Sequence, residues 1–421
     1  MRILISSNSP FMTSGYGIQN FYMIKMFIEM GHEVYIICWD IVVNEEYRYV
    51  KVTLEAIKEL IKKFNFDCTE KIDVYDDIYS KVNYFTNIYD NFPCVIYPKD
   101  INKLITQNKI DVFIYLLDAW IIIPEGKFSC KSACWLPLHF EPMESVTKEV
   151  LYLFDHIVLM SKYGRKIYLD EFPKKTKNIS IIPHIVDKYT LGIEDDMNKK
   201  YTRDSFREEL KIPKDAFMVT MIAKNAEESN RKGFDMNIAG FKKFLDQVPN
   251  AILYLHTSML GACNISSIIL YNSIPVDKVW IADQDKIIHG YNHNYMNGIY
   301  KSTDIFLGAT CSEGFGLPLV EAQFMGVPVV GTNCTAMKDY VFNGYLADYI
   351  QKRFVYVNES YWYIPDPESI KDCLLKIYNR SEKEKENMKE YGIRNVNKTC
   401  KYDVIKRKWN NLLNNLFKQP T

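Results

Sequence analysis

The feature that most constrains the fold is an alternation of short apolar runs and amphipathic helical patterns over most of the 421 residues. Alternation of this kind predicts an α/β protein with buried parallel strands, in doubly wound sheets that bind ligands at the carboxyl ends of their strands. A helix is expected over 18–30, ending at Gly31, and another over 54–64. The expected strands of the first series are 3–6, 33–38, 111–116, 133–138 and 156–160.

A second series begins after a polar segment, residues 193–201, which lacks apolar periodicity and is expected to be an interdomain linker. We therefore predict two Rossmann-like domains, 1–190 and 200–400, facing one another across a cleft, a division that the length of the chain also favours. A last helix within 401–421 has one apolar stripe and is expected to pack back on the N-terminal domain. The expected strands of the second series are 217–223, 251–256, 278–282, 305–309, 327–331 and 362–364.

Charge and composition argue against several classes of function. The 52 basic residues balance 52 acidic ones, which argues against a nucleic-acid-binding surface. Residues 1–7 look like a buried strand rather than a secretory signal, and the longest apolar run, 112–124, is too short to span a bilayer. The ten cysteines show no spacing typical of disulfides or of a zinc site. We expect a cytoplasmic protein with at most peripheral membrane contact.

The most informative stretch is 310–331, where a glycine loop follows an apolar strand and precedes a helix and a further strand. Pro318 is expected at the first helical position, and Gly326 just after the last turn. Free backbone amides would then lie at a helix N-terminus beside the carboxyl end of a strand, an arrangement suited to a pyrophosphate. These amides belong to Gly314, Phe315, Gly316 and Leu317.

Two glutamates bracket this loop. Because a carboxylate beside a phosphate is repelled, each is expected to face neutral hydroxyls: Glu313 those of a sugar, and Glu321 those of a ribose. Glu313 and Glu321, with the following 326–331, resemble the E-x7-E motif of glycosyltransferase family 4 and its GT-B relatives. The resemblance covers most of the chain and is weakest over 44–100, whose elements show no clear order and where we expect acceptor specificity to be encoded.

The resemblance implies a GT-B fold and the transfer of a hexose, with retention, from a UDP- or GDP-sugar to a glycan, glycolipid or protein. Glu313 would orient the sugar, and Lys232 of a Lys-Gly pair would neutralise the departing diphosphate. Its basic partner is either Lys224 or Arg231. No metal and no other cofactor is implied. The acidic triplet 283–285 matches the D-x-D of metal-dependent transferases of a different fold, and we interpret it as a chance match.

The N-terminal half supplies weaker matches. Gly15 and Gly17 resemble the family's glycine loop beneath the donor phosphates, and His139 resembles a histidine that contacts the sugar, although a purely structural histidine is an equal alternative. A nucleotide-sugar epimerase of the same fold and a catalytically idle nucleotide- or glycan-binding scaffold remain open. An NAD-linked oxidoreductase is disfavoured, because the complete glycine fingerprint is missing.

Overall fold

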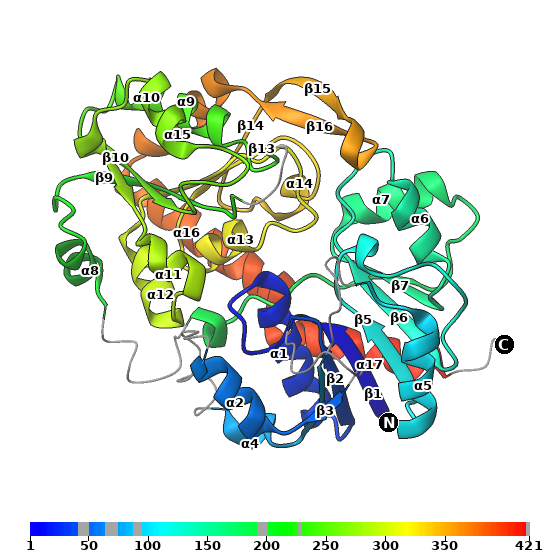
Figure 1. Ribbon diagram of the computed structural model, residues 1–421. Coiled ribbons are helices and arrows are strands. Elements are labelled where there is room, and N and C mark those ends of the chain that lie inside the picture. Colours follow the sequence, from blue (N-terminus) through cyan, green and yellow to red (C-terminus); the bar gives the residue numbers. More distant parts are fainter. Residues whose placement is uncertain (41–49, 64–74, 87–94, 192–200, 226–229, 418–421) are drawn as a thin grey trace. The chain divides into compact units, whose positions relative to one another are not determined.

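The computed structural model describes residues 1–40, 50–63, 75–86, 95–191, 201–225 and 230–417 (Figure 1). The chain divides into two compact units. Unit 1 consists of Met1–Leu138, Met143–Ile185 and Tyr402–Thr421, and unit 2 of His139–Pro142 and Val186–Lys401. Most of the predicted linker, 193–200, lies outside the described residues.

Unit 1 is built on an eight-stranded sheet of order β3-β4-β2-β1-β5-β6-β7-β8. Its neighbours pair in parallel, except that β3 runs antiparallel to β4. Each strand predicted for this half is confirmed. These strands were predictable since they are buried on both faces of the sheet, and such strands consist of continuous apolar runs. The strands are β1 (Arg2–Ser7), β2 (Glu33–Cys38), β3 (Val50–Val52), β4 (Val82–Thr86), β5 (Val112–Tyr115), β6 (Lys131–Leu136), β7 (His156–Leu159) and β8 (Ile179–Ile181).

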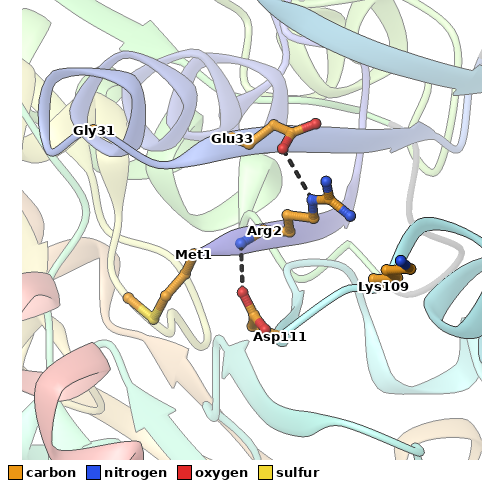
Figure 2. A pocket seen from close by; sticks show the side chains of 6 residues that line it. All are labelled: Met1, Arg2, Gly31, Glu33, Lys109 and Asp111. Atoms are coloured by element: carbon orange, nitrogen blue, oxygen red, sulfur yellow. Dashed lines mark hydrogen bonds and ion pairs between the residues drawn. The ribbon is translucent and has the colours of Figure 1, made fainter.

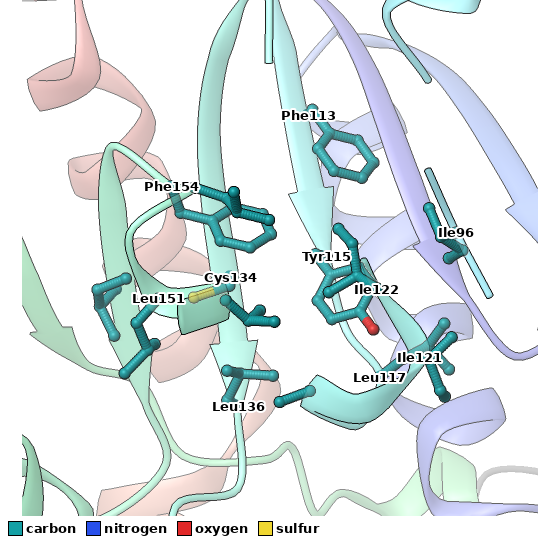
Figure 3. Close-up of a cluster of buried hydrophobic side chains, with 14 of the residues drawn as sticks. Ile96, Phe113, Tyr115, Leu117, Ile121, Ile122, Cys134, Leu136, Leu151 and Phe154 are labelled. Atoms are coloured by element: carbon teal, nitrogen blue, oxygen red, sulfur yellow. The ribbon is translucent and has the colours of Figure 1, made fainter. Parts of the chain in front are cut away.

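The helices of unit 1 bury apolar side chains against this sheet. In one cluster, Phe113 and Tyr115 of β5 and Leu136 of β6 pack with Phe154 and Ile122 (Figure 3). The α-helices are α1 (Gly15–Glu29), α2 (Leu54–Lys63), α4 (Asp76–Tyr79), α5 (Pro98–Asn108), α6 (Ser145–Leu151), α7 (Lys162–Glu171) and α17 (Tyr402–Leu416), and η1 (Ala119–Ile121) is a 3-10 turn.

The C-terminal helix α17 is part of unit 1. Its Trp409 is fully buried and meets Trp135 of β6 edge to face, with ring centroids 5.4 Å apart. The Trp409 ring also contacts Phe27 of α1 at 5.8 Å. At the start of the helix, the Tyr402 hydroxyl donates to the Glu29 carboxylate at 2.9 Å. The apolar stripe thus covers the hydrophobic surface of α1 and β6.

Unit 2 is built on a six-stranded parallel sheet of order β11-β10-β9-β12-β13-β14. Because β9 lies between β10 and β12, the chain leaves β9 and β12 in opposite directions, which creates a topological switch point at their carboxyl ends. The strands are β9 (Phe217–Ile222), β10 (Ala251–His256), β11 (Val279–Ile281), β12 (Ile305–Gly308), β13 (Val329–Thr332) and β14 (Gly344–Ala347).

The helices of unit 2 cover both faces of its sheet (Figure 1). They are α8 (Arg203–Glu209), α9 (Phe234–Leu245), α10 (Ile265–Tyr271), α11 (Gln284–His289), α12 (His293–Ser302), α13 (Leu317–Phe324), α14 (Met337–Tyr340), α15 (Pro367–Tyr378) and α16 (Glu382–Cys400). The shorter 3-10 turns are η2 (Lys188–Leu191), η4 (Val276–Lys278) and η5 (Tyr356–Asn358). Among the residues described, no helix combines the length and the apolar character needed to cross a membrane.

The prediction for 362–364 was wrong in one respect. These residues form part of a strand, β16 (Ser360–Pro365), but it pairs antiparallel with β15 (Tyr349–Val355) in a separate two-stranded sheet. The connection, 356–359, is too short for the crossover that parallel strands need. One face of this ribbon buries Trp362 and Ile364 against Cys311.

A cavity of about 450 Å³ lies at the amino end of β1 (Figure 2). Three of the lining residues contact one another: Arg2 Nε lies 3.0 Å from the Glu33 carboxylate, and the Arg2 amide donates to Asp111 at 2.8 Å. Ligands of doubly wound sheets bind at the opposite, carboxyl ends of the strands. This cavity is therefore not the candidate active site.

Candidate active site

The candidate site is formed by two loops that leave the switch point of unit 2. One loop follows β9 and leads into α9 through Gly233, and the other follows β12 and leads into α13. Two hydrogen bonds join them: the Cys311 amide donates to the Arg231 carbonyl at 2.8 Å, and the Arg231 side chain donates through Nη1 to the Ser312 carbonyl at 2.6 Å. The two loops therefore form one structural element.

Asn237, in the first turn of α9, fixes the base of both loops. Its buried amide donates to the carbonyls of Ala309 at 2.7 Å and Gly233 at 2.8 Å, and accepts from the Ala309 amide at 3.1 Å. Gly233 has a φ of +63°, and a side chain there would meet Ala309 and Asn237. Asn237 was not among the predicted site residues, although a polar residue among the buried apolar positions of this helix was a usable signal.

The loops bring together one carboxylate and two cations. Lys232 Nζ lies 2.7 Å from Glu313 Oε1, and Arg231 Nη1 lies 3.4 Å from Glu313 Oε2. The side chain of Lys232 is 17% exposed, that of Arg231 12% and that of Glu313 14%. Burial alone would raise the pKa of Glu313, but the two adjacent cations outweigh it and lower the pKa to about 2. Glu313 is consequently an anion at neutral pH.

The glycine loop after Glu313 leads into α13, as predicted. Gly316 precedes the helix with a φ of +83°, and Gly326 follows it with a φ of +81°, values that favour glycine. The helix begins at Leu317, so Pro318 takes the second helical position rather than the predicted first. The Glu313 amide donates to Thr335 Oγ1 at 3.1 Å, which ties the loop to the segment after β13. An anion-binding role for the amides of 314–317 stays a prediction.

Glu321 lies inside α13 and is only 8% exposed. Its Oε2 accepts a hydrogen bond of 2.7 Å from the hydroxyl of Tyr300, a fully buried residue of α12. Burial raises the pKa of Glu321 to about 7, although the Tyr300 hydrogen bond acts in the opposite direction. No sequence pattern had indicated Tyr300.

His139 belongs to unit 2, although it follows a strand of unit 1. The Ser312 hydroxyl donates to its carbonyl at 2.6 Å, and an electrostatic contribution from His139, smaller than those of Lys232 and Arg231, helps to lower the pKa of Glu313. Lys224, the alternative to Arg231, is exposed after β9. The structure therefore groups His139, Arg231 and Lys232 around Glu313, while their roles stay predictions.

Gly15 and Gly17 lie in unit 1, in the first turn of α1. The Gly17 amide donates to the side chain of the capping residue Ser14 at 3.1 Å. A Cβ atom at Gly17 would lie 2.5 Å from the Met12 carbonyl oxygen. Close packing alone thus requires glycine at this position, and a donor contact stays a prediction.

The acidic triplet 283–285 has a local structural role. The Asp283 carboxylate caps α11, accepting from the amide of Asp285 at 3.0 Å and from that of Lys286 at 3.4 Å. In the described part of the chain, no group of three or more His, Cys, Asp or Glu residues could hold a metal ion.

Comparisons with known proteins bear on the fold and on residues 219–380. Residues 219–380 match the family described as glycosyl transferases group 1, whereas a comparison with curated proteins gives no match. Among solved structures, sucrose-phosphate synthase from Thermosynechococcus elongatus has a TM-score of 0.67 at 13% identity, over 99% of each chain. A UDP-forming α,α-trehalose-phosphate synthase from Burkholderia xenovorans has a TM-score of 0.67 at 11% identity, also over 99% of each chain.

A glycosyltransferase from Rickettsia africae has a TM-score of 0.66 at 13% identity, over 100% of this chain and 99% of the other. At such identities these likenesses establish the fold and not the reaction. They confirm the prediction of a GT-B fold built from two Rossmann-like domains. The chain has the GT-B fold, and its residues 219–380 are similar to the family described as glycosyl transferases group 1.

Proposed function

We propose that the protein is a retaining glycosyltransferase that moves a hexose from a UDP- or GDP-sugar to a glycan, lipid or protein acceptor. One observation carries the proposal: Glu313 is held as an anion by Lys232 and Arg231, at the switch point of a glycosyltransferase group 1 domain. Cations and helix-end amides at such a point suit a diphosphate.

The chemistry follows from the hydrogen-bonding capacity of these groups. A lysine ammonium has three N–H donors and an arginine five, so Lys232 and Arg231 can hold Glu313 and still bind phosphate oxygens. Their charge would stabilise the departing nucleoside diphosphate without a metal ion. The amides of 314–317, at the start of α13, would bind the same diphosphate.

Glu313 would then act on the sugar. A carboxylate with a pKa near 2 cannot serve as a proton donor at neutral pH, but it is a strong hydrogen-bond acceptor for sugar hydroxyls. We assign the acceptor's proton to the leaving phosphate. His139 is proposed to contact the sugar, Glu321 the ribose, and Gly15 and Gly17 the donor phosphates.

The proposed identity of the donor has more support than that of the acceptor. The Burkholderia neighbour is described as UDP-forming, which favours UDP over GDP as the nucleotide of this chain. A cytoplasmic location and at most peripheral membrane contact remain part of the proposal.

The test is donor hydrolysis and transfer with a panel of UDP- and GDP-sugars, with the anomeric configuration of the product read by NMR. Glu313→Gln and Lys232→Ala should each lower kcat about 10²–10³-fold, the cost of removing one charge-stabilising group. Lys243→Ala is the matched control, because Lys243 lies on α9 and pairs with the exposed Glu368. Unchanged turnover in both site variants would falsify the proposal. An isomerised sugar released without an acceptor would identify an epimerase, and binding without turnover a scaffold.

A further inference from the structure

A buried hydrogen bond joins the two helices next to the candidate site. The Tyr300 hydroxyl on α12 donates to Glu321 Oε2 on α13 at 2.7 Å, and it lies at 3.4 Å from the Pro318 carbonyl. Tyr300 is 0% exposed and its ring packs against Phe306 of β12, with centroids 6.5 Å apart. The phenol is therefore fixed by the core of unit 2.

The hydrogen bond from Tyr300 uses only part of the hydrogen-bonding capacity of the Glu321 carboxylate. A carboxylate has about four lone-pair sites on two oxygens. Within the described ranges of the chain, Tyr300 is the one hydrogen-bond partner of the Glu321 side chain. A buried carboxylate with unused acceptor sites is costly unless another donor completes them. Oε1 is thus available to accept from a ligand hydroxyl.

We propose that Tyr300 is a positioning residue that orients Glu321, leaving Oε1 to accept a hydrogen bond from a ribose hydroxyl of the nucleotide donor. This inference rests on the proposed function and adds to it a residue with a defined role. It also predicts how the affinity for the donor depends on pH.

The pH dependence follows from the surroundings of Glu321. Burial raises its pKa to about 7, and the Tyr300 hydrogen bond favours the ionised form. The strands beside α13, β12 and β13, carry no charged side chain. On α16, Lys389 lies against Gly326 at the far end of α13 and pairs with Glu386 at 3.0 Å. In the preceding loop, Glu313 is paired with Lys232 and Arg231.

The predicted pH dependence is tested by measuring the affinity of the full chain for UDP-glucose and GDP-glucose by calorimetry between pH 6 and 8.5. Neither probe has a phosphate group that titrates in this range. An ionised Glu321 is the better acceptor, so affinity should rise about tenfold from pH 6 to pH 8. Tyr300→Phe should move the midpoint of this rise upward and weaken binding at pH 7 about tenfold. It should raise the donor KM with little change in kcat.

Two comparisons separate positioning from a general structural effect. A 2′,3′-dideoxyribose form of the tighter-binding probe lacks the proposed hydroxyl, so its binding should be independent of pH and unaffected by Tyr300→Phe. Tyr254→Phe is the matched control, because it also removes one buried tyrosine hydroxyl from unit 2 and should leave binding unchanged.

The outcomes are distinct. If neither nucleotide sugar binds at any pH, the proposed function fails together with this inference. If one binds, but Tyr300→Phe leaves the pH midpoint in place or weakens the dideoxy probe equally, the role of Tyr300 is refuted and the proposed function stands. Should Tyr300→Phe not fold, Glu321→Gln decides: loss of the pH dependence supports the inference, and its persistence refutes it.

Discussion

Glu313→Gln should destabilise unit 2 as well as impair the proposed reaction. The substitution keeps the shape of the side chain and removes its charge, so that Lys232 and Arg231, both mostly buried, lose the Glu313 carboxylate. Leaving one side of a buried ion pair uncompensated is strongly destabilising. The ion pairs at 2.7 and 3.4 Å are therefore expected to have a measurable effect on the free energy of unfolding.

The magnitude follows from the pKa. A fall from the ordinary value of 4.5 to about 2 in the folded state corresponds to about 3 kcal/mol, at roughly 1.36 kcal/mol per pKa unit. Because the folded-state pKa is the lower one, this stabilisation is present above pH 4.5 and is lost as the pH falls toward 2. About 2 kcal/mol of it should be gone by pH 3.

The measurement is urea unfolding of the full chain and of Glu313→Gln from pH 7 to pH 3, followed by circular dichroism. The two proteins should differ by about 3 kcal/mol at pH 7 and converge as the pH falls. Glu368→Gln is the control, since Glu368 pairs with Lys243 and Lys371 on an exposed surface and should change little. A Glu313→Gln protein as stable as Glu368→Gln at pH 7, or a constant difference across the range, would refute the reasoning.

Three further substitutions test the packing that supports the site and the fold. Asn237→Ala should lower the free energy of unfolding by about 2–4 kcal/mol in urea, because it leaves buried loop groups unpaired, and should also reduce turnover. Gly17→Ala should lower the thermal midpoint, at a cost of about 1–3 kcal/mol, because its Cβ would lie 2.5 Å from the Met12 carbonyl oxygen. Trp409→Ala should cost about 3–5 kcal/mol in urea unfolding by opening a cavity beside Trp135.

The parts of the fold that were predicted correctly share one property: their apolar pattern is local. β2, for example, is a continuous apolar run buried over nearly its whole length, and the predicted bounds match. α16 was not among the predicted elements, because its surface is mostly charged and few of its positions are buried. Its start was nevertheless encoded, since Ser381 and Glu384 form a capping box.

Side-chain partners were less predictable than positions. The loops that carry Lys232 and Glu313 were both identified from the sequence, but the two residues were predicted to bind different parts of the donor. Their ion pair forms because β9 and β12 pair in parallel, which brings the two loops together. Asn237 bonds to Ala309, far away along the chain, and Tyr300 bonds to Glu321 on the next helix. Such contacts depend on how elements pack, and a single sequence has no periodicity that reports them.

The two glutamates of the E-x7-E pattern show how the packing of neighbouring side chains affects function. The sequence presents the same residue type twice, and desolvation acts on both in the same direction. Two cations keep Glu313 ionised with a pKa near 2, whereas Glu321 accepts a hydrogen bond from the neutral phenol of Tyr300 and has a pKa near 7. A group that is always charged is suited to a constant task, such as holding sugar hydroxyls beside a diphosphate. A group that titrates near neutrality makes the affinity for its ligand depend on pH. The same residue type can therefore supply both the fixed and the pH-sensitive acceptor of one site, because the neighbouring side chains determine its charge.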